Sequence, residues 1–480
     1  YDENNNGWAT YTHTVHTIGF GLDHPLLGDI AESSGGIYIT AFNEGQLINA
    51  FHSLSLAMTE SQSFVAPVVS VDQANRTQSG DKIYTAFFRP LENDYWIGNL
   101  KKYGLRLMQR TECGRSTSEW VVVGSDNQPA VDCYGNFYPT SKSIWSKVAD
   151  GGEAAAGGVG ALLKDAMPGP HPTNVDQGAK WWDFRNMFTY DSATSSMVRF
   201  IRDNITSTDL NVADDETRDK VINFMYGYEF AVKDTTKGSP TFKREWILGD
   251  MVHSEPTIID YLDKDNGLEA RFVVAGANDG MLHVFTDQAI TLTNAAGKSE
   301  TYEPGREIWA FIPEDLLGNL KNFGDPSVHH YFVDGFSSLY RSRTFNDDVI
   351  NDGYRGDDEY YNKTLVLSER RGGNSYWALD VSKPNPMDWT VKWQIQGGGD
   401  PALNPYSELK QTWSKPIFSR IQMPDDTFKD VVIFAGGYDP EEDGYPEVWE
   451  DNDEDGIKDS GESHTDTVGG TAGTYEYFNP

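Results

Sequence analysis

Twelve residues near the end of the chain, DNDEDGIKDSGE, have the residue types and spacing of a calcium-binding loop. Alternate residues of a tightly turning loop point inward, a glycine at the sixth position permits the sharp turn, and a final glutamate reaches the ion with both oxygens. The predicted oxygen ligands are Asp451, Asp453, Asp455, the backbone carbonyl of Ile457, Asp459 and Glu462. A flexible oxygen cage favours calcium over magnesium, and with no histidine or cysteine in these twelve residues zinc is disfavoured.

The charge of this loop supports the same interpretation. It carries six carboxylates and one lysine, so its like charges repel one another, and metal binding is expected to order the segment. The flanking strings GYPEVWE and SHTDTVGG do not have the pattern of amphipathic helices, which predicts a calcium loop without the helices of an EF-hand. His464 is predicted to be a solvated neighbour of the loop. An ordinary solvated acidic run is the alternative.

A second acidic segment runs from Asn346 to Asn362. It lacks the one-three-five register, so a solvated loop is favoured there over a second calcium site. The segment also contains Arg355-Gly356-Asp357, the tripeptide that integrins read. Any loop rich in these residue types can contain that tripeptide by chance, so integrin recognition stays an alternative.

Histidines do not form a catalytic motif in this sequence. His253, His283, His329 and His330 lie on or beside apolar strings, and we predict that they are hydrogen-bonded structural residues. The sequence contains no nucleophile elbow, phosphate loop or zinc motif. We therefore expect binding and no enzymatic activity, and no catalytic residue is predicted.

Length and charge narrow the class of protein. The chain has 480 residues, enough for two or three domains, and a formal net charge of −34. Binding to nucleic acid requires lysine and arginine clustered on one face, and the sequence has no such cluster, so nucleic acid is not an expected partner. No window approaches about 18 uninterrupted apolar residues, so no transmembrane segment is expected. The chain opens without an initiator methionine or a signal peptide, which we interpret as trimmed ends.

The two cysteines bear on whether the protein lies in an oxidising compartment. Cys113 and Cys133 flank a polar loop with a short valine run. A disulfide would close this loop in an oxidising environment, and we favour that pairing. Two unlinked buried thiols are the alternative.

The first residues have the pattern of an α/β unit. HTVHTIGFG and IYITAF read as strands, whereas HPLLGDIAESSGG and NEGQLINAFHSLSLAM have helical spacing, the second beginning at a capping asparagine. Strand, helix, strand, helix favours a parallel sheet, but four elements are too few to bury one. We interpret residues 1–62 as the C-terminal part of a larger domain.

The sequence pattern of the rest of the chain changes once, between residues 243 and 244. Residues 63–243 have a mixed α/β pattern, whereas residues 244–480 contain short β-strings punctuated by glycine, proline, asparagine and aspartate. FVVAGANDGMLHVF and TLVLSERRGGNSYWALDV share one pattern, a strand, a glycine turn and a second strand with an aromatic residue. A mainly β fold with a β-propeller is predicted, because one four-stranded blade cannot bury both faces alone. A sandwich is the structural alternative.

Several strings, taken in order, resemble the PilY/PilC-type proteins of type IV pili. They are YWIGNLKKYGL, IWSKVADGGEAAAGGVGALL, REWILGDMVHSEPTII, FVVAGANDGMLHVF, EIWAFIPEDLLGNL, HHYFVDG, RRGGNSYWALDVS and AGGYD. The first 62 residues resemble the C-terminal half of a von Willebrand factor A domain, without its metal-ion-dependent adhesion motif. The resemblance implies a modified β-propeller, incomplete in this chain, with calcium held in a loop. In this family the ligands come from the first nine loop positions, which would place Glu462 outside the set.

The resemblance also implies a role. It predicts a calcium-binding, secreted protein at the pilus tip, exported through the periplasm and outer membrane, that promotes pilus assembly, controls extension and retraction, and attaches to surfaces. Minor pilins and receptors on host or abiotic surfaces are the expected partners. Two alternatives remain from the residues alone. One is a quinone-dependent propeller dehydrogenase, which shares tryptophan-rich blades, and the other is a structural cell-surface protein without pili.

Overall fold

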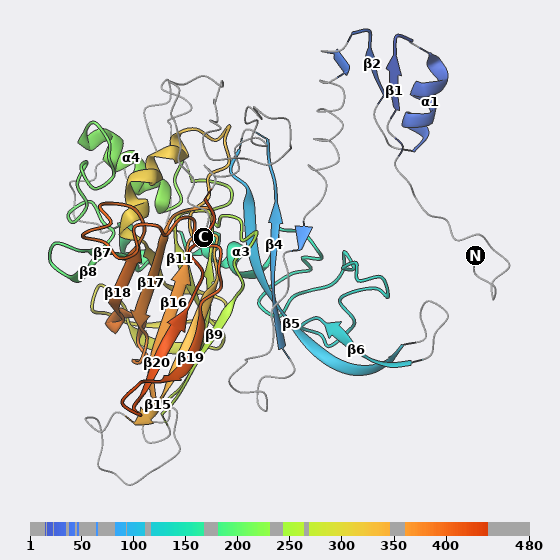
Figure 1. Ribbon diagram of the computed structural model, residues 1–480. Helices are drawn as coiled ribbons and strands as arrows, with labels where there is room; N and C mark the ends of the chain where they lie inside the picture. The colour runs from blue at the N-terminus through green and yellow to red at the C-terminus, as the bar shows by residue number, and fades with distance from the viewer. Residues whose placement is uncertain are drawn as a thin grey trace, which may run out of the picture.

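The protein is mainly β, as predicted from its sequence. The computed structural model describes residues 15, 17–22, 24–34, 38–43, 46–47, 64–65, 82–92, 94–110, 117–167, 181–230, 243–263, 268–345 and 361–439. Figure 1 shows most of the described strands gathered in one body, while the first two strands and their helix lie apart from it (Figure 1).

The first elements form a small parallel α/β unit. They are β1 (Thr17–Phe20), α1 (Pro25–Ser33) and β2 (Tyr38–Ala41). β1 and β2 pair in parallel, and α1 connects them with a proline at its first position, where the missing N–H costs nothing. The predicted order of strand, helix and strand is confirmed. The assignment to a von Willebrand factor A domain stays a prediction.

A four-stranded antiparallel sheet follows, in the order β3-β4-β5-β6. Its strands are β3 (Phe64–Val65), β4 (Lys82–Arg89), β5 (Ile97–Arg110) and β6 (Thr117–Val123). Side chains of a strand alternate between its two faces. In β4, Tyr84 and Ala86 enter the large central core, while Ile83 and Phe87 enter a second, smaller core. β4 and β5 therefore form a wall between two cores.

The segment after β6 contains the predicted disulfide. Cys133 is disulfide-bonded, and the sequence has one other cysteine, Cys113, which lies outside the described residues. Arg110, at the end of β5, donates a hydrogen bond of 2.7 Å to the carbonyl of Val131. The pairing is thus confirmed at its described end, in a loop that is also tied to β5.

The largest sheet has six strands in the order β8-β7-β14-β11-β10-β9. Their bounds are β7 (Met187–Asp191), β8 (Ser196–Arg199), β9 (Thr257–Asp263), β10 (Leu268–Gly276), β11 (Leu282–Thr286) and β14 (Glu307–Ile312). β14 pairs with β7 in parallel, and the other neighbours are antiparallel. Since β7 and β8 precede residue 244, one sheet and one core include residues on both sides of the predicted boundary at 243/244.

The third large sheet is a four-stranded antiparallel meander. It consists of β15 (Ser337–Phe345), β16 (Tyr361–Ser368), β17 (Ser375–Asp380) and β18 (Thr390–Gln396). Two hairpins accompany the sheets, β12 (Ile290–Thr293) with β13 (Ser299–Tyr302), and β19 (Ile417–Gln422) with β20 (Phe428–Ile433). The strands β9, β10, β11 and β14 have the same meander order. Both sheets have the form expected of propeller blades, while closure into a propeller stays a prediction.

Short helices lie between these strands along the chain. They are α3 (Gly158–Ala166), η2 (Trp181–Phe184), α4 (Asp215–Met225), η4 (Glu314–Gly324) and η6 (Pro386–Asp388). α4 begins at Asp215 because the Asp214 side chain accepts a 2.8 Å hydrogen bond from the Thr217 N–H and acidic residues fill the first turn.

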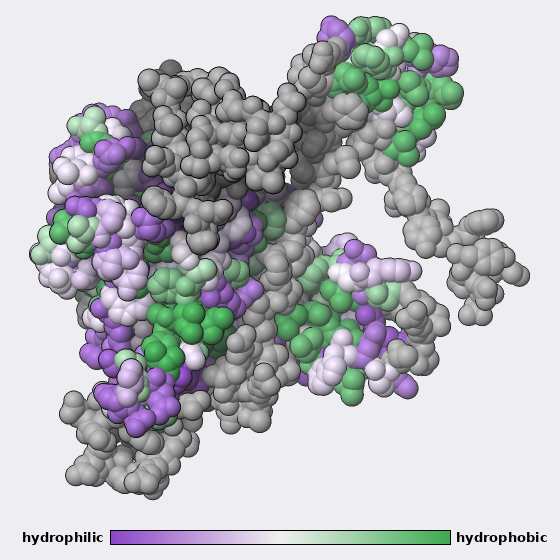
Figure 2. All heavy atoms as spheres, in the orientation of Figure 1, coloured by the Kyte–Doolittle hydropathy of each residue, from purple (hydrophilic) through white to green (hydrophobic). Residues whose placement is uncertain are grey.

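The β19–β20 hairpin leaves apolar side chains on the surface. Ile417 and Ile433 face each other across the two strands and are 63% and 52% exposed. Ile421 and Phe428 are exposed as well, and apolar residues gather over this hairpin in Figure 2. An antiparallel sheet with apolar residues exposed in this way has a surface suited to burial against further protein.

A buried pair of carboxyl groups joins η4 to the third sheet. Asp315 and the fully buried Glu369 hydrogen-bond one another, and the Trp377 Nε1–H lies 3.2 Å and 3.1 Å from their oxygens. Burial raises the pKa of both groups, and for Glu369 the charge of Asp315 raises it further. Two carboxyl groups that hydrogen-bond one another cannot both ionise without a cost in free energy, because their negative charges would repel, so the pair retains a proton.

Replacing Glu369 with glutamine should stabilise the protein at alkaline pH. A raised folded-state pKa means that wild-type stability falls as pH rises above about 4.3, the pKa of an unfolded glutamate, towards the folded-state pKa of the pair. We expect Glu369→Gln to increase the free energy of unfolding at pH 8 by on the order of 1 kcal/mol, and by less at pH 5. Urea unfolding at both pH values measures this, with the exposed Glu303→Gln as control. Equal effects of both substitutions at pH 8 would contradict the assignment.

Candidate functional site

The predicted calcium loop lies outside the described residues. The predicted ligands Asp451, Asp453, Asp455, Ile457, Asp459 and Glu462 lie beyond residue 439, where the described residues end. Arg355-Gly356-Asp357 of the second acidic segment lies outside the described residues as well, between residues 345 and 361. These sites therefore stay predictions. Within the described ranges, no cluster of three or more histidine, cysteine, aspartate or glutamate side chains has a geometry that would hold a metal ion.

The described motif residues instead converge on buried ionic networks. Arg185, which precedes β7, forms a two-pronged ion pair with Glu307 of β14, with Nε–Oε2 and Nη2–Oε1 distances of 2.6 and 2.7 Å. His283 of β11 lies between Glu307 and Asp279, with Nδ1 at 2.7 Å from the first and Nε2 at 2.9 Å from the second. Asp279 also accepts a hydrogen bond from the Gly249 N–H. His283 is thus a structural histidine, as predicted.

The charges of this network stabilise one another. Burial alone would lower the pKa of His283, but the negative charges of Asp279 and Glu307 outweigh burial and raise it to about 9. Burial likewise opposes ionisation of Glu307, yet Arg185 and His283 lower its pKa to about 2. All four groups are therefore ionised near neutral pH, which is tolerable in a dry interior only because each charge is paired.

A second network extends from the same β10–β11 turn. His329 Nε2 lies 2.8 Å from Asp250 Oδ2, and the Asn278 Nδ2–H donates to Asp250 Oδ1 at 2.7 Å. On the other side of Asn278, His253 Nδ1 lies 2.8 Å from Asp334 Oδ2. The structural role predicted for His253 and His329 is confirmed.

Two adjacent lysines in the string NLKKYGL, Lys101 and Lys102, form ion pairs on opposite faces of β5. Lys101 Nζ lies 3.1 Å from Asp150 Oδ2 on one side of the strand, and Lys102 Nζ lies 2.5 Å from Asp287 Oδ1 on the other. Burial lowers the pKa of both lysines, and the paired aspartates oppose that effect. Because consecutive side chains point in opposite directions, two neighbouring lysines tie β5 to two different parts of the fold.

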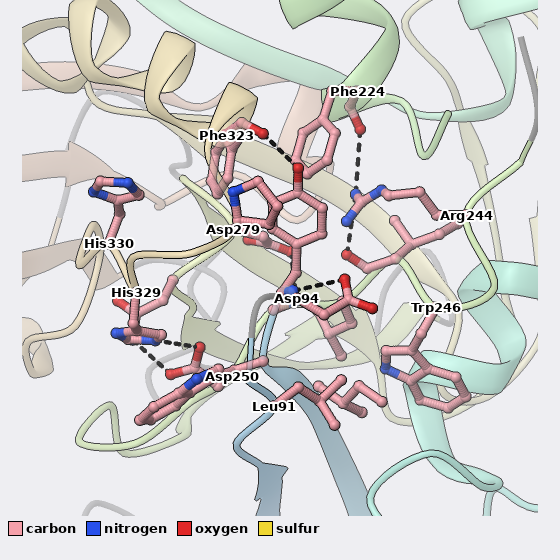
Figure 3. A pocket seen from close by; sticks show the side chains of 18 of the residues that line it. Leu91, Asp94, Phe224, Arg244, Trp246, Asp250, Asp279, Phe323, His329 and His330 are labelled. Atoms are coloured by element: carbon pink, nitrogen blue, oxygen red, sulfur yellow. Dashed lines mark hydrogen bonds and ion pairs between the residues drawn. The ribbon is translucent and has the colours of Figure 1, made fainter. Parts of the chain in front are cut away.

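A cavity of about 670 Å³ lies against both networks. Its walls come from the β4–β5 connection, the end of α4, the segment 244–250, the β10–β11 turn and the end of η4. Figure 3 shows its side chains, with Asp250 and His329 bonded to each other on one side and Arg244 and Trp246 on the other (Figure 3). Aromatic rings also line it, among them Trp96, whose ring centre lies 3.9 Å from that of His329.

Arg244 is the most unusual group in this wall, since it is buried with no carboxylate bonded to it among the described residues. It is 7% exposed, its Nη2 donates to the carbonyls of Phe224 and Ile247, and its guanidinium carbon lies 3.9 Å from the centre of the Phe224 ring. Burial lowers its pKa to about 10, against the partial opposition of Asp279. Its Nε is a buried donor without a hydrogen-bond partner in the described part of the chain.

Other polar groups of the cavity wall are also unmatched. His330 Nε2 is buried without a hydrogen-bond partner among the described residues, which differs from the structural bonding predicted for this histidine. Glu229, which is half-buried, and Glu245, which is exposed, line the cavity and form no hydrogen bond or ion pair with any residue that the structure describes. Buried polar groups are normally satisfied, so the unmatched nitrogens of Arg244 and His330 favour a ligand at this cavity.

This arrangement suits binding. The cavity offers donors at Arg244 and His330, acceptors at Glu229 and Glu245, and several aromatic rings. Donors, acceptors and rings of this kind can recognise a polar ligand through hydrogen bonds and ring contacts.

Reading the sequence did not find this cavity. Arg244, Trp246 and Asp250 all belong to the string REWILGDMVHSEP, which was recognised only as a resemblance. The available signal was an arginine two residues before a tryptophan in a segment with few strands, but the ring and charge partners come from residues tens to hundreds of positions away.

Replacing His283 should destabilise the protein in a pH-dependent way. The raised pKa means that its contribution is complete below about pH 6.5, the pKa of an unfolded histidine, and is lost as pH rises through about 9. We expect His283→Gln to lower the free energy of unfolding at pH 6 by about 3 kcal/mol, and by less at pH 9.5. Denaturant unfolding at both pH values measures this, with the exposed His24→Gln as control. A loss that does not depend on pH would contradict a charged, paired His283.

Comparisons with known proteins give a consistent set of relatives. A type IV pilus biogenesis factor PilY1 homologue of Xylella fastidiosa is 26% identical over 248 residues, which is 46% of this chain and 14% of the relative. PilY1 of Pseudomonas aeruginosa is 26% identical over 42% of the chain in strain UCBPP-PA14, and 23% identical over 85% of the chain in strain PAK. The chain spans 16% and 30% of the length of these two relatives.

The other comparisons return nothing. No family model and no solved structure matches the chain. Across the described residues, no helix combines the length and apolar character needed to span a bilayer. The resemblance drawn from the motifs is nevertheless confirmed by the alignment over 85% of the chain, and the chain is a PilY1-like protein.

Proposed function

We propose that the chain is the calcium-binding part of a type IV pilus biogenesis factor that acts at the pilus tip. The observation that carries this proposal is the alignment to PilY1 of Pseudomonas aeruginosa strain PAK over 437 residues. Relatives with this name are described as type IV pilus biogenesis factors. Pilus assembly, control of extension and retraction, and surface attachment are the functions that we transfer to this chain.

The calcium loop would be the regulatory element. Asp451, Asp453, Asp455, Ile457, Asp459 and Glu462 would supply oxygen ligands, and the ion would neutralise the repulsion among the carboxylates. A segment that is ordered by calcium and loosened without it has two states. Such a segment gives a physical route by which calcium would bias pilus extension against retraction.

The described fold would be the scaffold for this role. Buried ion pairs and large aromatic cores connect the sheets, so loops on their surface are held at fixed positions. Binding to other proteins, without turnover, is the proposed activity. Minor pilins and receptors on host or abiotic surfaces are the proposed partners, at an extracellular location reached through the periplasm and outer membrane.

Calcium titration tests the loop. We expect the wild-type chain to release binding heat with one calcium ion, and Asp453→Ala to weaken the affinity by about tenfold or more because it removes a charged ligand. Asp348→Ala is the matched control, since it removes one carboxylate from the second acidic segment, which lacks the register. Isothermal titration calorimetry measures all three proteins. Identical heats from wild type and Asp453→Ala would rule out the loop as the site.

Retention of pilins tests the partner assignment. The immobilised chain should retain purified minor pilins and should retain much less of the major pilin, which supplies the filament shaft and serves as control. Retention is measured in calcium and again after chelation with EGTA, since loosening of the loop should reduce it if the loop contributes to the interface. A chain that retains no minor pilin in either condition would favour a structural surface protein without pili.

A further inference from the structure

We propose that the cavity between the β4–β5 connection, α4 and η4 binds a neutral saccharide. This inference deepens the proposed function, since it rests on surface attachment and names the class of molecule that the chain would recognise there. The argument uses the unmatched groups at Arg244, His330, Glu229 and Glu245 and the ring of Trp246.

The mixture of unmatched donors and acceptors selects the ligand. An anion would satisfy the Arg244 and His330 nitrogens but would be repelled by Glu229 and Glu245, and a cation would do the reverse. Each hydroxyl group of a sugar both donates and accepts, and neighbouring hydroxyls lie side by side on one ring. A polyhydroxyl ligand can therefore satisfy both sets of groups without introducing a charge into the cavity.

His330 has the protonation state that this ligand requires. Burial lowers its pKa, and the neighbouring His329 lowers it further, so the imidazole is neutral near pH 7. A neutral imidazole donates at one nitrogen and accepts at the other. It can therefore bind a hydroxyl group without demanding a negative charge.

Trp246 provides a fixed aromatic surface. Its Nε1–H donates a 2.7 Å hydrogen bond to the Gly98 carbonyl, which fixes the ring plane. Gly160 of α3 lies so close that a Cβ there would be 2.2 Å from Trp246 Cζ2, which prevents the ring from moving towards α3. No ring of another described residue stacks on Trp246. The C–H face of a sugar ring is apolar and packs on such a surface.

Size and overall charge agree with this ligand. A cavity of about 670 Å³ lies within the range of roughly 300–1,000 Å³ that is typical of small-molecule sites. The net charge of −34 repels anionic ligands at long range but leaves a neutral sugar unaffected. Recognition would then depend on the local groups of the cavity alone.

The test combines a broad glycan array with saturation-transfer-difference NMR on the full chain. The NMR probes are array-positive glycans together with maltose, lactose and N,N′-diacetylchitobiose, and citrate and spermidine represent the anionic and cationic alternatives. Glu229→Gln and Glu245→Gln remove one charged acceptor each while preserving shape. Glu216→Gln on α4 is the matched control, because its side chain is 80% exposed and lies outside the cavity lining.

We expect at least one glycan to bind the wild-type chain and the Glu216→Gln control equally. Glu229→Gln should weaken that binding by about tenfold, the loss expected for one hydrogen bond to a charged group. Glycan binding that neither Glu229→Gln nor Glu245→Gln alters would place it elsewhere and overturn the proposal. So would an array without any binder, or binding of citrate or spermidine alone. Calcium titration and minor-pilin retention on the same variants stay unchanged if only the saccharide assignment is wrong.

Discussion

The two-pronged ion pair between Arg185 and Glu307 determines how the central sheet is assembled. Both side chains are almost fully buried, so neither charge has water as a partner, and removing either one would leave the other unpaired in the core. Arg185 precedes β7 and Glu307 begins β14, and these two strands pair in parallel from Met187 opposite Ala310. The ion pair thus fixes which part of the earlier chain joins the later sheet, and in which register.

The same requirement extends from the sheet to the cavity. The buried Glu307 carboxylate is paired with His283, and His283 is also paired with Asp279. Asp279 accepts a hydrogen bond from the Gly249 N–H, which positions the segment that carries Arg244 and Trp246. Each of these side chains forms its hydrogen bonds within this series of residues. The unmatched nitrogens of Arg244 and His330 at the cavity lie outside this series of bonds, and a ligand is the simplest account of them.

The sequence predicted the local structure well because its signals are local. The strings with a strand, a glycine turn and a second strand predicted the hairpins β10–β11 and β16–β17, and the first strings of the chain predicted β1, α1 and β2. The adjacent Lys101 and Lys102 were visible in the sequence, but their two aspartate partners were not. Arg185 and Glu307 are 122 residues apart, and no periodicity indicates such a pairing. For that reason a compositional boundary at residues 243/244 was predicted inside what the structure shows to be one sheet.

Strong negative charge limits what such a surface can bind. A net charge of −34 raises the cost of bringing any anion near the protein, while divalent cations are attracted wherever carboxylates lie close together. The proposed calcium loop would use that field directly, because an ion with two positive charges would relieve the repulsion among its ligands. The cavity uses a different principle, since buried networks neutralise its back wall and leave only short-range hydrogen bonds and ring contacts for recognition. In this proposal an ion-sensitive element is separate from a recognition surface that is insensitive to salt, so the two can act independently.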